Sequence, residues 1–235
     1  MNEPPADVIG SPVPLAQRLR PALERTILEL VVEAFEQWGA RGFNRFGDTE
    51  VEFTTVLIGQ MREVRRVRNL PFMPCSEQFE YSPEMFAGTA APNRAPRIDI
   101  SVWWDRLAEN AYYTIECKRL APGDLAKKYV NEGLIRFVSG KYAGATPAAA
   151  MIGYAITHAP EVLLDQVNEH VQQHPELTDS DLLVPTAPIH ALTTVYESRH
   201  QRHAPHVAIR VTHLFLDVRG RPVLSTANHD NKDVE

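Results

Sequence analysis

The sequence has little cysteine and no long apolar run. Its 235 residues include two cysteines, Cys75 and Cys117, and Cys117 falls on the apolar face of a predicted strand. We therefore expect neither a disulfide framework nor a thiolate zinc site. No segment reaches the about 18 consecutive apolar residues of a membrane-spanning helix, and the start of the chain lacks the basic-then-apolar pattern of a secretion signal. These absences predict a cytoplasmic protein without membrane contact.

Net positive charge is also missing. The 24 Lys and Arg residues are outnumbered by 30 Asp and Glu residues, which gives a formal charge of −6. Non-specific affinity for nucleic acid comes mainly from Lys and Arg displacing counterions from phosphates, so this balance disfavours tight unaided binding. The sequence has no P-loop, no Gly-x-Gly-x-x-Gly and no Gly-x-Ser-x-Gly. The last absence argues against an unrelated serine or cysteine hydrolase.

Basic residues nevertheless gather in three local clusters. They are Arg62, Arg65, Arg66 and Arg68; Lys118, Arg119, Lys127 and Lys128; and the segment Arg199-His200-Gln201-Arg202-His203. Each cluster is either a solvated face or a contact surface for phosphate. Weak intrinsic binding, combined with recruitment by a partner protein, would reconcile such contacts with the acidic total.

The length and composition predict one globular domain. At 44% hydrophobic and 23% charged residues, the chain can bury one core but is short for two. Four prolines mark residues 1–20 as an irregular N-terminal arm. The domain covers residues 21–223, and residues 224–235 form a polar tail.

The order of predicted elements indicates an α/β fold. Apolar residues at helical spacing predict helices over four segments, which are 21–38, 49–64, 124–139 and 161–174. Strands are predicted over 97–104, 112–118, 148–157, 192–196 and 207–218, with a short one near 78–81 inside a proline-rich connection. This order predicts a central mixed β-sheet flanked by helices on both sides.

The most informative stretch is the predicted hairpin over residues 97–118. Side chains alternate between the two faces of a strand, so one face carries the apolar residues Ile98, Ile100, Ile115 and Cys117. The other face carries Asp99, Glu116 and Lys118 side by side. Two carboxylates and an amine are costly to bury unless they bind something. Hard oxygen ligands suit Mg²⁺, so a divalent cation is the natural candidate.

The spacing of these residues resembles a known signature. Asp99, followed after 16 residues by Glu116-Cys117-Lys118, is similar to the Asp...(Asp/Glu)-x-Lys pattern of the PD-(D/E)xK nuclease superfamily. The placement also matches, because the Asp is on one predicted strand, the Glu-x-Lys is on the next and a helix follows. The family usually has proline directly before the aspartate, whereas here two residues separate them, in Pro96-Arg97-Ile98-Asp99. Residues 129–154 also look like a block of bacterial PD-(D/E)xK-like proteins, some of them associated with phage defence.

The resemblance, which extends over about residues 48–217, implies a restriction-endonuclease-like core and a metal-dependent nuclease. Asp99 and Glu116 would hold one or two Mg²⁺ ions, for which Mn²⁺ could substitute, with the backbone carbonyl of Cys117 as a further ligand. Lys118 would orient or deprotonate the attacking water. The implied substrate is nucleic acid, DNA rather than RNA, and the implied role is that of an endonuclease and defence effector. A homodimer or an activating partner protein would be compatible with this role.

Further candidate residues come from the flanking helices. In the resembled superfamily an acidic residue from a preceding helix often completes the metal site, and Glu52 or Glu50 could do so here. Alternatively, Thr49 and Glu52 form a capping box. Lys128, Arg136 and Arg119 are candidates for contact with nucleic acid, although Lys128, Glu132 and Arg136 also have the spacing of an ordinary ion-pair ladder.

Three other interpretations compete with an active nuclease. Asp99, Glu116 and Lys118 could form a structural salt-bridge cluster. The fold could also be a catalytically inactive module for nucleic-acid binding or assembly. The third, an unrelated serine or cysteine hydrolase, has no Gly-x-Ser-x-Gly elbow to support it. Separately, the spacing of His200, His203 and His206 suggests a zinc site, but Pro205 and the polar surroundings indicate a surface loop.

Overall fold

A computed structural model describes residues 21–42, 49–79, 97–104, 112–144, 146–204 and 206–219, together with the single residues 85, 89, 91 and 95. The predicted N-terminal arm, the polar tail and the hairpin loop over 105–111 lie outside the described residues. Within the described part, no helix is long and apolar enough to cross a membrane.

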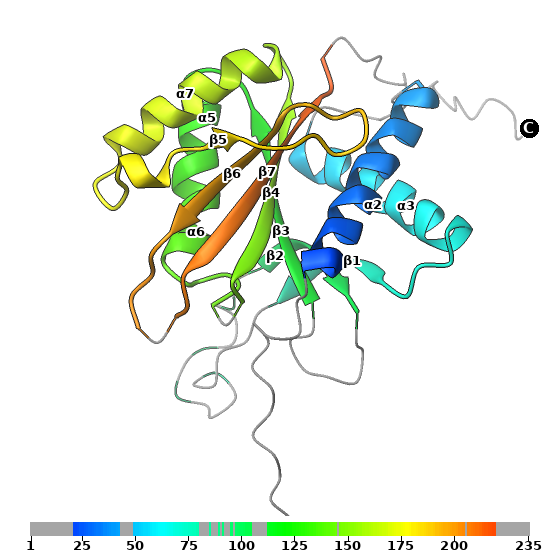
Figure 1. The fold of residues 1–235 in the computed structure, drawn as a ribbon, viewed down its shortest axis with the longest axis horizontal. Helices are drawn as coiled ribbons and strands as arrows, with labels where there is room; N and C mark the ends of the chain where they lie inside the picture. Colours follow the sequence, from blue (N-terminus) through cyan, green and yellow to red (C-terminus); the bar gives the residue numbers. More distant parts are fainter. Residues whose placement is uncertain are drawn as a thin grey trace, which may run out of the picture.

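Seven strands form one mixed sheet, which confirms the predicted α/β class (Figure 1). Their order across the sheet is β1-β2-β3-β4-β7-β6-β5. The central pairs β3·β4 and β4·β7 are parallel, and the pairs on either side are antiparallel. The strands are β1 Met73–Phe79, β2 Arg97–Trp103, β3 Tyr112–Leu120, β4 Ala148–Ala155, β5 Val184–Pro185, β6 Val195–His200 and β7 Ile209–Asp217.

Helices pack on this sheet through two separate hydrophobic clusters. Residues of α2 (Pro21–Ala40) and α3 (Glu50–Val67) share the first cluster with one set of strand residues. The second cluster contains α5 (Asp124–Lys128), a π-helical turn η2 (Tyr129–Leu134), α6 (Ile135–Val138) and α7 (Pro160–Gln173). Figure 1 shows α2 and α3 together, in blue and cyan, and the green and yellow helices grouped apart from them.

The prediction of one apolar and one charged face for the hairpin is wrong. Both faces of β3 are packed, and its residues are buried along almost the whole strand. Ile100, Ile115 and Cys117 join the first cluster, but Ile98 joins the second. The backbone is distorted there, because Glu77, between the β1 residues paired with Ile100 and Ile98, has a φ of 54°. Simple alternation therefore fails at Asp99.

Two further elements differ from their predicted positions. The short strand expected near residues 78–81 is β1, which starts earlier at Met73 and contains Pro74. Proline is tolerated because β1 is the edge of the sheet. The helix expected over 124–139 is interrupted by η2, a wider turn that changes the angular spacing of side chains. Accordingly, within the described residues no ion pair joins Glu132 to Lys128 or Arg136, so the predicted ladder is absent.

The predicted histidine loop is also partly wrong. His200 is the last residue of β6 and is buried, because this strand runs from Val195 to His200 and not over 192–196. Its neighbours His203 and His206 lie beyond the strand. Both cysteines are free thiols, and Cys117 is buried as predicted.

Candidate active site

The site begins where the backbone pairing of β2 and β3 ends. Their antiparallel register runs from Trp103 and Tyr112 to Ile100 and Ile115. Beyond these positions, the backbone N–H and C=O of Cys117 form hydrogen bonds with side chains and not with the backbone of β2. Asp99 Oδ2 accepts the N–H of Cys117 at 2.8 Å, and Lys118 Nζ donates to its carbonyl at 2.8 Å. Asp99 and Glu116 therefore lie where side-chain hydrogen bonds replace the backbone hydrogen bonds between β2 and β3.

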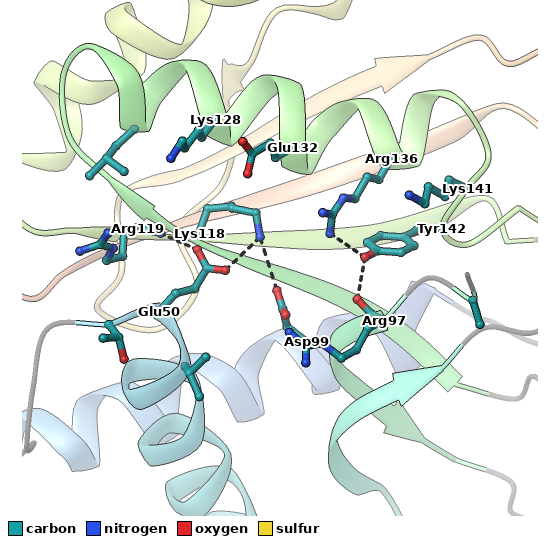
Figure 2. A pocket seen from close by; sticks show the side chains of 14 residues that line it. Glu50, Arg97, Asp99, Lys118, Arg119, Lys128, Glu132, Arg136, Lys141 and Tyr142 are labelled. Carbon is teal, nitrogen blue, oxygen red and sulfur yellow. Dashed lines mark hydrogen bonds and ion pairs between the residues drawn. The ribbon is translucent and has the colours of Figure 1, made fainter. Parts of the chain in front are cut away.

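The ammonium of Lys118 lies at the centre of three carboxylates. Its Nζ is 2.7 Å from Glu116 Oε1, 3.1 Å from Glu50 Oε1 and 3.8 Å from Asp99 Oδ2. Figure 2 shows the contacts with Glu50 and Asp99. Burial alone would lower the pKa of Lys118, but the charges of Glu116, Asp99 and Glu50 outweigh burial and raise this pKa. Lys118 is therefore a fixed cation, and the predicted trio of Asp99, Glu116 and Lys118 is brought together by the fold.

Glu116 is the most constrained acid of the site. Its side chain is fully buried, and Oε1 accepts from both Lys118 Nζ and Arg136 Nη1 at 2.7 and 2.8 Å. The other oxygen, Oε2, is buried without a hydrogen-bond partner. Burial and the charge of Asp99 raise the pKa of Glu116 to about 8, against the opposing effect of the two cations. A buried unpaired carboxylate oxygen is expensive, and an additional cation would satisfy it.

The structure separates the two acidic candidates at the start of α3. Glu52 belongs to the capping box, in which its Oε2 accepts from the N–H and hydroxyl of Thr49 at 3.2 and 2.8 Å. Glu50 instead lies beside Lys118, and its Oε2 accepts the N–H of Arg119 at 3.2 Å. The acid from the preceding helix that faces the hairpin is therefore Glu50 and not Glu52. The capping-box spacing in the sequence was the signal that distinguishes them.

A basic cavity of about 590 Å³ opens above these carboxylates. Six cationic side chains line it, namely Arg97, Lys118, Arg119, Lys128, Arg136 and Lys141. The acidic side chains in its lining are Glu50, Asp99 and Glu132. Figure 2 shows Lys128, Glu132 and Arg136 on the helical segment above the strands, with Glu50 and Asp99 opposite. The cavity thus concentrates positive charge locally, although the whole chain is acidic.

Tyr142 is a site residue that sequence reasoning missed. Its hydroxyl donates to the carbonyl of Arg97 at 2.6 Å and accepts from Arg136 Nη1 at 2.7 Å. Burial and the nearby charge of Glu116 raise the pKa of Tyr142 to about 12. Nothing in the sequence around Tyr142 indicated this contact, because Arg97 is 45 residues away.

Oxygen atoms surround the Lys118 ammonium. Within the described part of the chain, no three acidic, histidine or cysteine side chains are grouped closely enough to hold a metal ion. The Lys118 ammonium itself is the cation among the oxygens of Glu116, Glu50 and Cys117. These are hard donors, which suit Mg²⁺.

A second buried polar network lies in the other half of the sheet. Asp181 Oδ1 is 2.6 Å from His200 Nδ1, and Ser198 Oγ is 2.7 Å from the Nε2 atoms of both His200 and His213. The Tyr129 hydroxyl is 2.9 Å from His213 Nδ1. The order Asp, His, Ser is that of a nucleophilic triad. However, Ser198 is 2% exposed and its oxygen is occupied by both histidines, so the serine cannot meet a substrate.

Comparisons with family models, with curated proteins and with solved structures gave no match.

Proposed function

We propose that the chain is a metal-dependent nuclease that hydrolyses phosphodiester bonds of nucleic acid. Its preferred substrate is DNA, which it cuts as an endonuclease. One observation carries this proposal. Asp99, Glu116 and the carbonyl of Cys117 surround a single cationic group, the Lys118 ammonium, at the floor of a basic cavity. A site for phosphate diesters needs both features, since the wall attracts the anionic backbone and the floor holds the ion that activates water.

Each residue has a distinct role in the proposed reaction. Asp99 and Glu116 would hold Mg²⁺ or Mn²⁺ together with the Cys117 carbonyl, and Glu50 would add a further oxygen. When bound, the metal ion supplies an activated water and neutralises charge on the phosphate. Lys118 would orient that water and offset the charge that develops on the phosphate. Lys128 and Arg119 in the wall would contact the flanking phosphates.

The wider assignments are part of the same proposal. The mixed sheet and its two hydrophobic clusters are compatible with a restriction-endonuclease-like core. The formal charge of −6 favours a chain that is brought to nucleic acid by a partner protein or by pairing of two copies. Action as an effector of a bacterial defence system would fit such recruitment.

Cleavage assays with matched variants test the nuclease proposal. Supercoiled plasmid and a single-stranded oligonucleotide are incubated with wild type, Asp99→Asn and Lys118→Met in Mg²⁺, Mn²⁺ or a chelator. Asp99→Asn keeps an oxygen for the Cys117 N–H but loses the charge. We expect both variants to lose at least about 100-fold in rate, and the chelator to abolish cleavage. Equal cleavage by all three proteins, or none by wild type with either metal, would contradict the proposal.

An inactive binding module is the second candidate. It is favoured by the fact that Lys118 already forms ion pairs with Glu50 and Glu116 in the described structure. In that case wild type retains DNA without cutting it, and retention is unchanged by a chelator. Metal-independent retention in a filter-binding assay, with no cleavage, would therefore select the binding module.

A further inference from the structure

A chain of hydrogen bonds links the two acid-bearing strands through the helical wall of the cavity. Tyr142 donates its hydroxyl proton to the carbonyl of Arg97 at 2.6 Å. The same hydroxyl accepts from Arg136 Nη1 at 2.7 Å, and that nitrogen also donates to Glu116 Oε1 at 2.8 Å. Figure 2 shows the Arg97, Tyr142 and Arg136 part of this chain. The connection runs from β2, through Tyr142 beyond the end of α6 and Arg136 on α6, to the carboxylate on β3.

This link lies where the two strands have stopped pairing. The β2·β3 register ends at Ile100 and Ile115, and Arg97 is two residues from Asp99 on the unpaired side. Without backbone ladder bonds, the separation of Asp99 from Glu116 depends on side chains. The Asp99 bond to the Cys117 N–H is one of them. The Lys118 ammonium, 2.7 Å from Glu116 Oε1 and 3.8 Å from Asp99 Oδ2, is a second. The Tyr142 and Arg136 link is a third connection, and it ties Glu116 to the backbone of β2.

The link is built to be rigid. Tyr142 is 1% exposed, and its ring meets Phe137 edge-on at 5.8 Å between centroids. The Arg136 guanidinium lies 5.3 Å from the Tyr142 ring centroid, a cation–π distance. The guanidinium also forms charge-assisted bonds, which are stronger than neutral ones. By contrast, Lys128 and Lys141 line the same cavity on flexible stems.

We propose that Tyr142 and Arg136 are positioning residues that hold Glu116 in register with Asp99, so that both carboxylates keep the separation a shared divalent cation needs. This inference rests on the proposed function, which makes Asp99 and Glu116 metal ligands. It assigns Arg136 a different task from direct contact with nucleic acid. Partners that orient metal-ligating carboxylates typically change metal affinity or activity 10- to 100-fold when they are altered.

The test uses Tyr142→Phe, which keeps the ring and its packing but removes the hydroxyl. Mn²⁺ affinity is measured by electron paramagnetic resonance on the full chain. The amide proton of Cys117, bonded to Asp99, is followed by NMR in the metal-free protein. We expect about 10-fold weaker Mn²⁺ binding, a shifted and faster-exchanging Cys117 amide, and cleavage that recovers at high Mn²⁺. Arg136→Lys should act in the same direction and more strongly, because an ammonium cannot reproduce the guanidinium geometry.

Tyr113→Phe is the matched control. It removes a buried tyrosine hydroxyl from β3 itself. That hydroxyl donates to Glu24 Oε1 at 3.0 Å, and Tyr113 does not line the cavity. This variant should leave Mn²⁺ affinity and the Cys117 amide as in wild type. A Tyr142→Phe protein that matches wild type in both readouts overturns the inference. If wild type binds no Mn²⁺, the proposed function fails, while the Cys117 amide still decides whether Tyr142 holds the two strands.

Discussion

Two buried polar networks occupy the same row of the sheet and differ in how completely their hydrogen bonds are satisfied. Glu116 on β3 pairs with Met151 on β4, and Met151 pairs with His213 on β7. Met151 thus separates the candidate active site from the network of Tyr129, His213, Ser198, His200 and Asp181. The neighbouring positions make the contrast informative, because both networks share one sheet and one covering helix.

The network on the His213 side allows one donor for each acceptor. Burial lowers the pKa of His200, which favours its neutral form. With Asp181 Oδ1 accepting from His200 Nδ1–H, Nε2 of the neutral ring accepts from the Ser198 hydroxyl. Ser198 Oγ then accepts from His213 Nε2–H, and His213 Nδ1 accepts from Tyr129. This assignment keeps both imidazoles neutral, and burial accordingly lowers the pKa of His200 and of His213.

The site around Lys118 has no such balance. One ammonium faces three carboxylates, and Glu116 Oε2 has no partner. A saturated buried network stabilises one structure, whereas an unsaturated one retains capacity for a ligand. The difference teaches that burial of charged and polar groups alone does not mark a functional site. Incomplete satisfaction next to an open cavity is what distinguishes the candidate site from the network around His213.

The largest expected effect on stability comes from breaking the saturated network. Ser198→Ala leaves His200 Nε2 and the His213 Nε2–H without partners, at about 1–3 kcal/mol for each buried group. We expect the free energy of unfolding to fall by about 2–6 kcal/mol, measured by chemical denaturation. The control Ser139→Ala removes an exposed hydroxyl bonded to the Arg136 carbonyl and should change stability by less than about 0.5 kcal/mol. Equal effects of the two variants would remove the contrast.

The two networks should respond to pH in opposite directions. The raised pKa of Glu116, about 8 against the usual 4.5, means that the folded state holds this proton more tightly. Its contribution to stability is therefore present at acid pH and lost as pH rises towards about 8. The lowered pKa values of His200 and His213 mean the reverse, so their contribution is lost as pH falls below the unfolded value of 6.5.

Glu116→Gln separates these two pH responses in the metal-free protein. Because glutamine does not titrate, the variant does not lose stability as pH rises towards about 8, whereas the contribution of the two histidines still increases. Its free energy of unfolding should therefore rise more steeply between about pH 5 and pH 8 than that of wild type. The difference should be on the order of a few kcal/mol. It is measured by denaturation across this range with a chelator present. Parallel pH curves for the two proteins would show that Glu116 is ionised in the folded state throughout.

The smallest effects concern the glycines on the helices. A Cβ at Gly133 would lie 2.4 Å from Met151 Cε, the residue between the two networks, and 3.5 Å from Lys118 Cγ. Gly133→Ala should therefore lower the free energy of unfolding by about 1–2 kcal/mol. A Cβ at Gly59 on α3 meets no atom within 4 Å, so Gly59→Ala should raise stability by up to about 1 kcal/mol. Thermal denaturation of both variants checks the opposite signs.

Local sequence patterns predicted the elements and the acidic trio well. The two runs of strand-forming residues over 97–104 and 112–118 identified β2 and β3, and the fold brings Asp99, Glu116 and Lys118 together. These predictions depend on residues that are close in sequence or on adjacent strands of a hairpin. Strand pairing then converts sequence order directly into proximity.

Features set by tertiary contacts could not be predicted in the same way. The resemblance named Glu50 beside Glu52 without choosing between them, and the contact of Glu50 with Lys118 spans 68 residues. The contact of Tyr142 with Arg97, which spans 45 residues, was not predicted. The π-helical turn η2 has no distinct apolar period, so the spacing over 124–139 reads as an ordinary helix. His200 was assigned to a loop because the polar residues around it hide a strand whose buried partners, Asp181 and Ser198, are hydrogen-bonded groups.

The position of β7 constrains how the molecule is made. This strand, the last of the described chain, lies between β4 and β6. The partner of β4 on that side therefore follows β4 in the sequence by more than 50 residues. On the ribosome, β1 to β4 emerge first, with the edge of β4 unpaired until residues 209–217 arrive. Closure of the sheet therefore follows synthesis of residues 209–217, and until then the edge of the alanine-rich strand β4 is open to pairing with another chain.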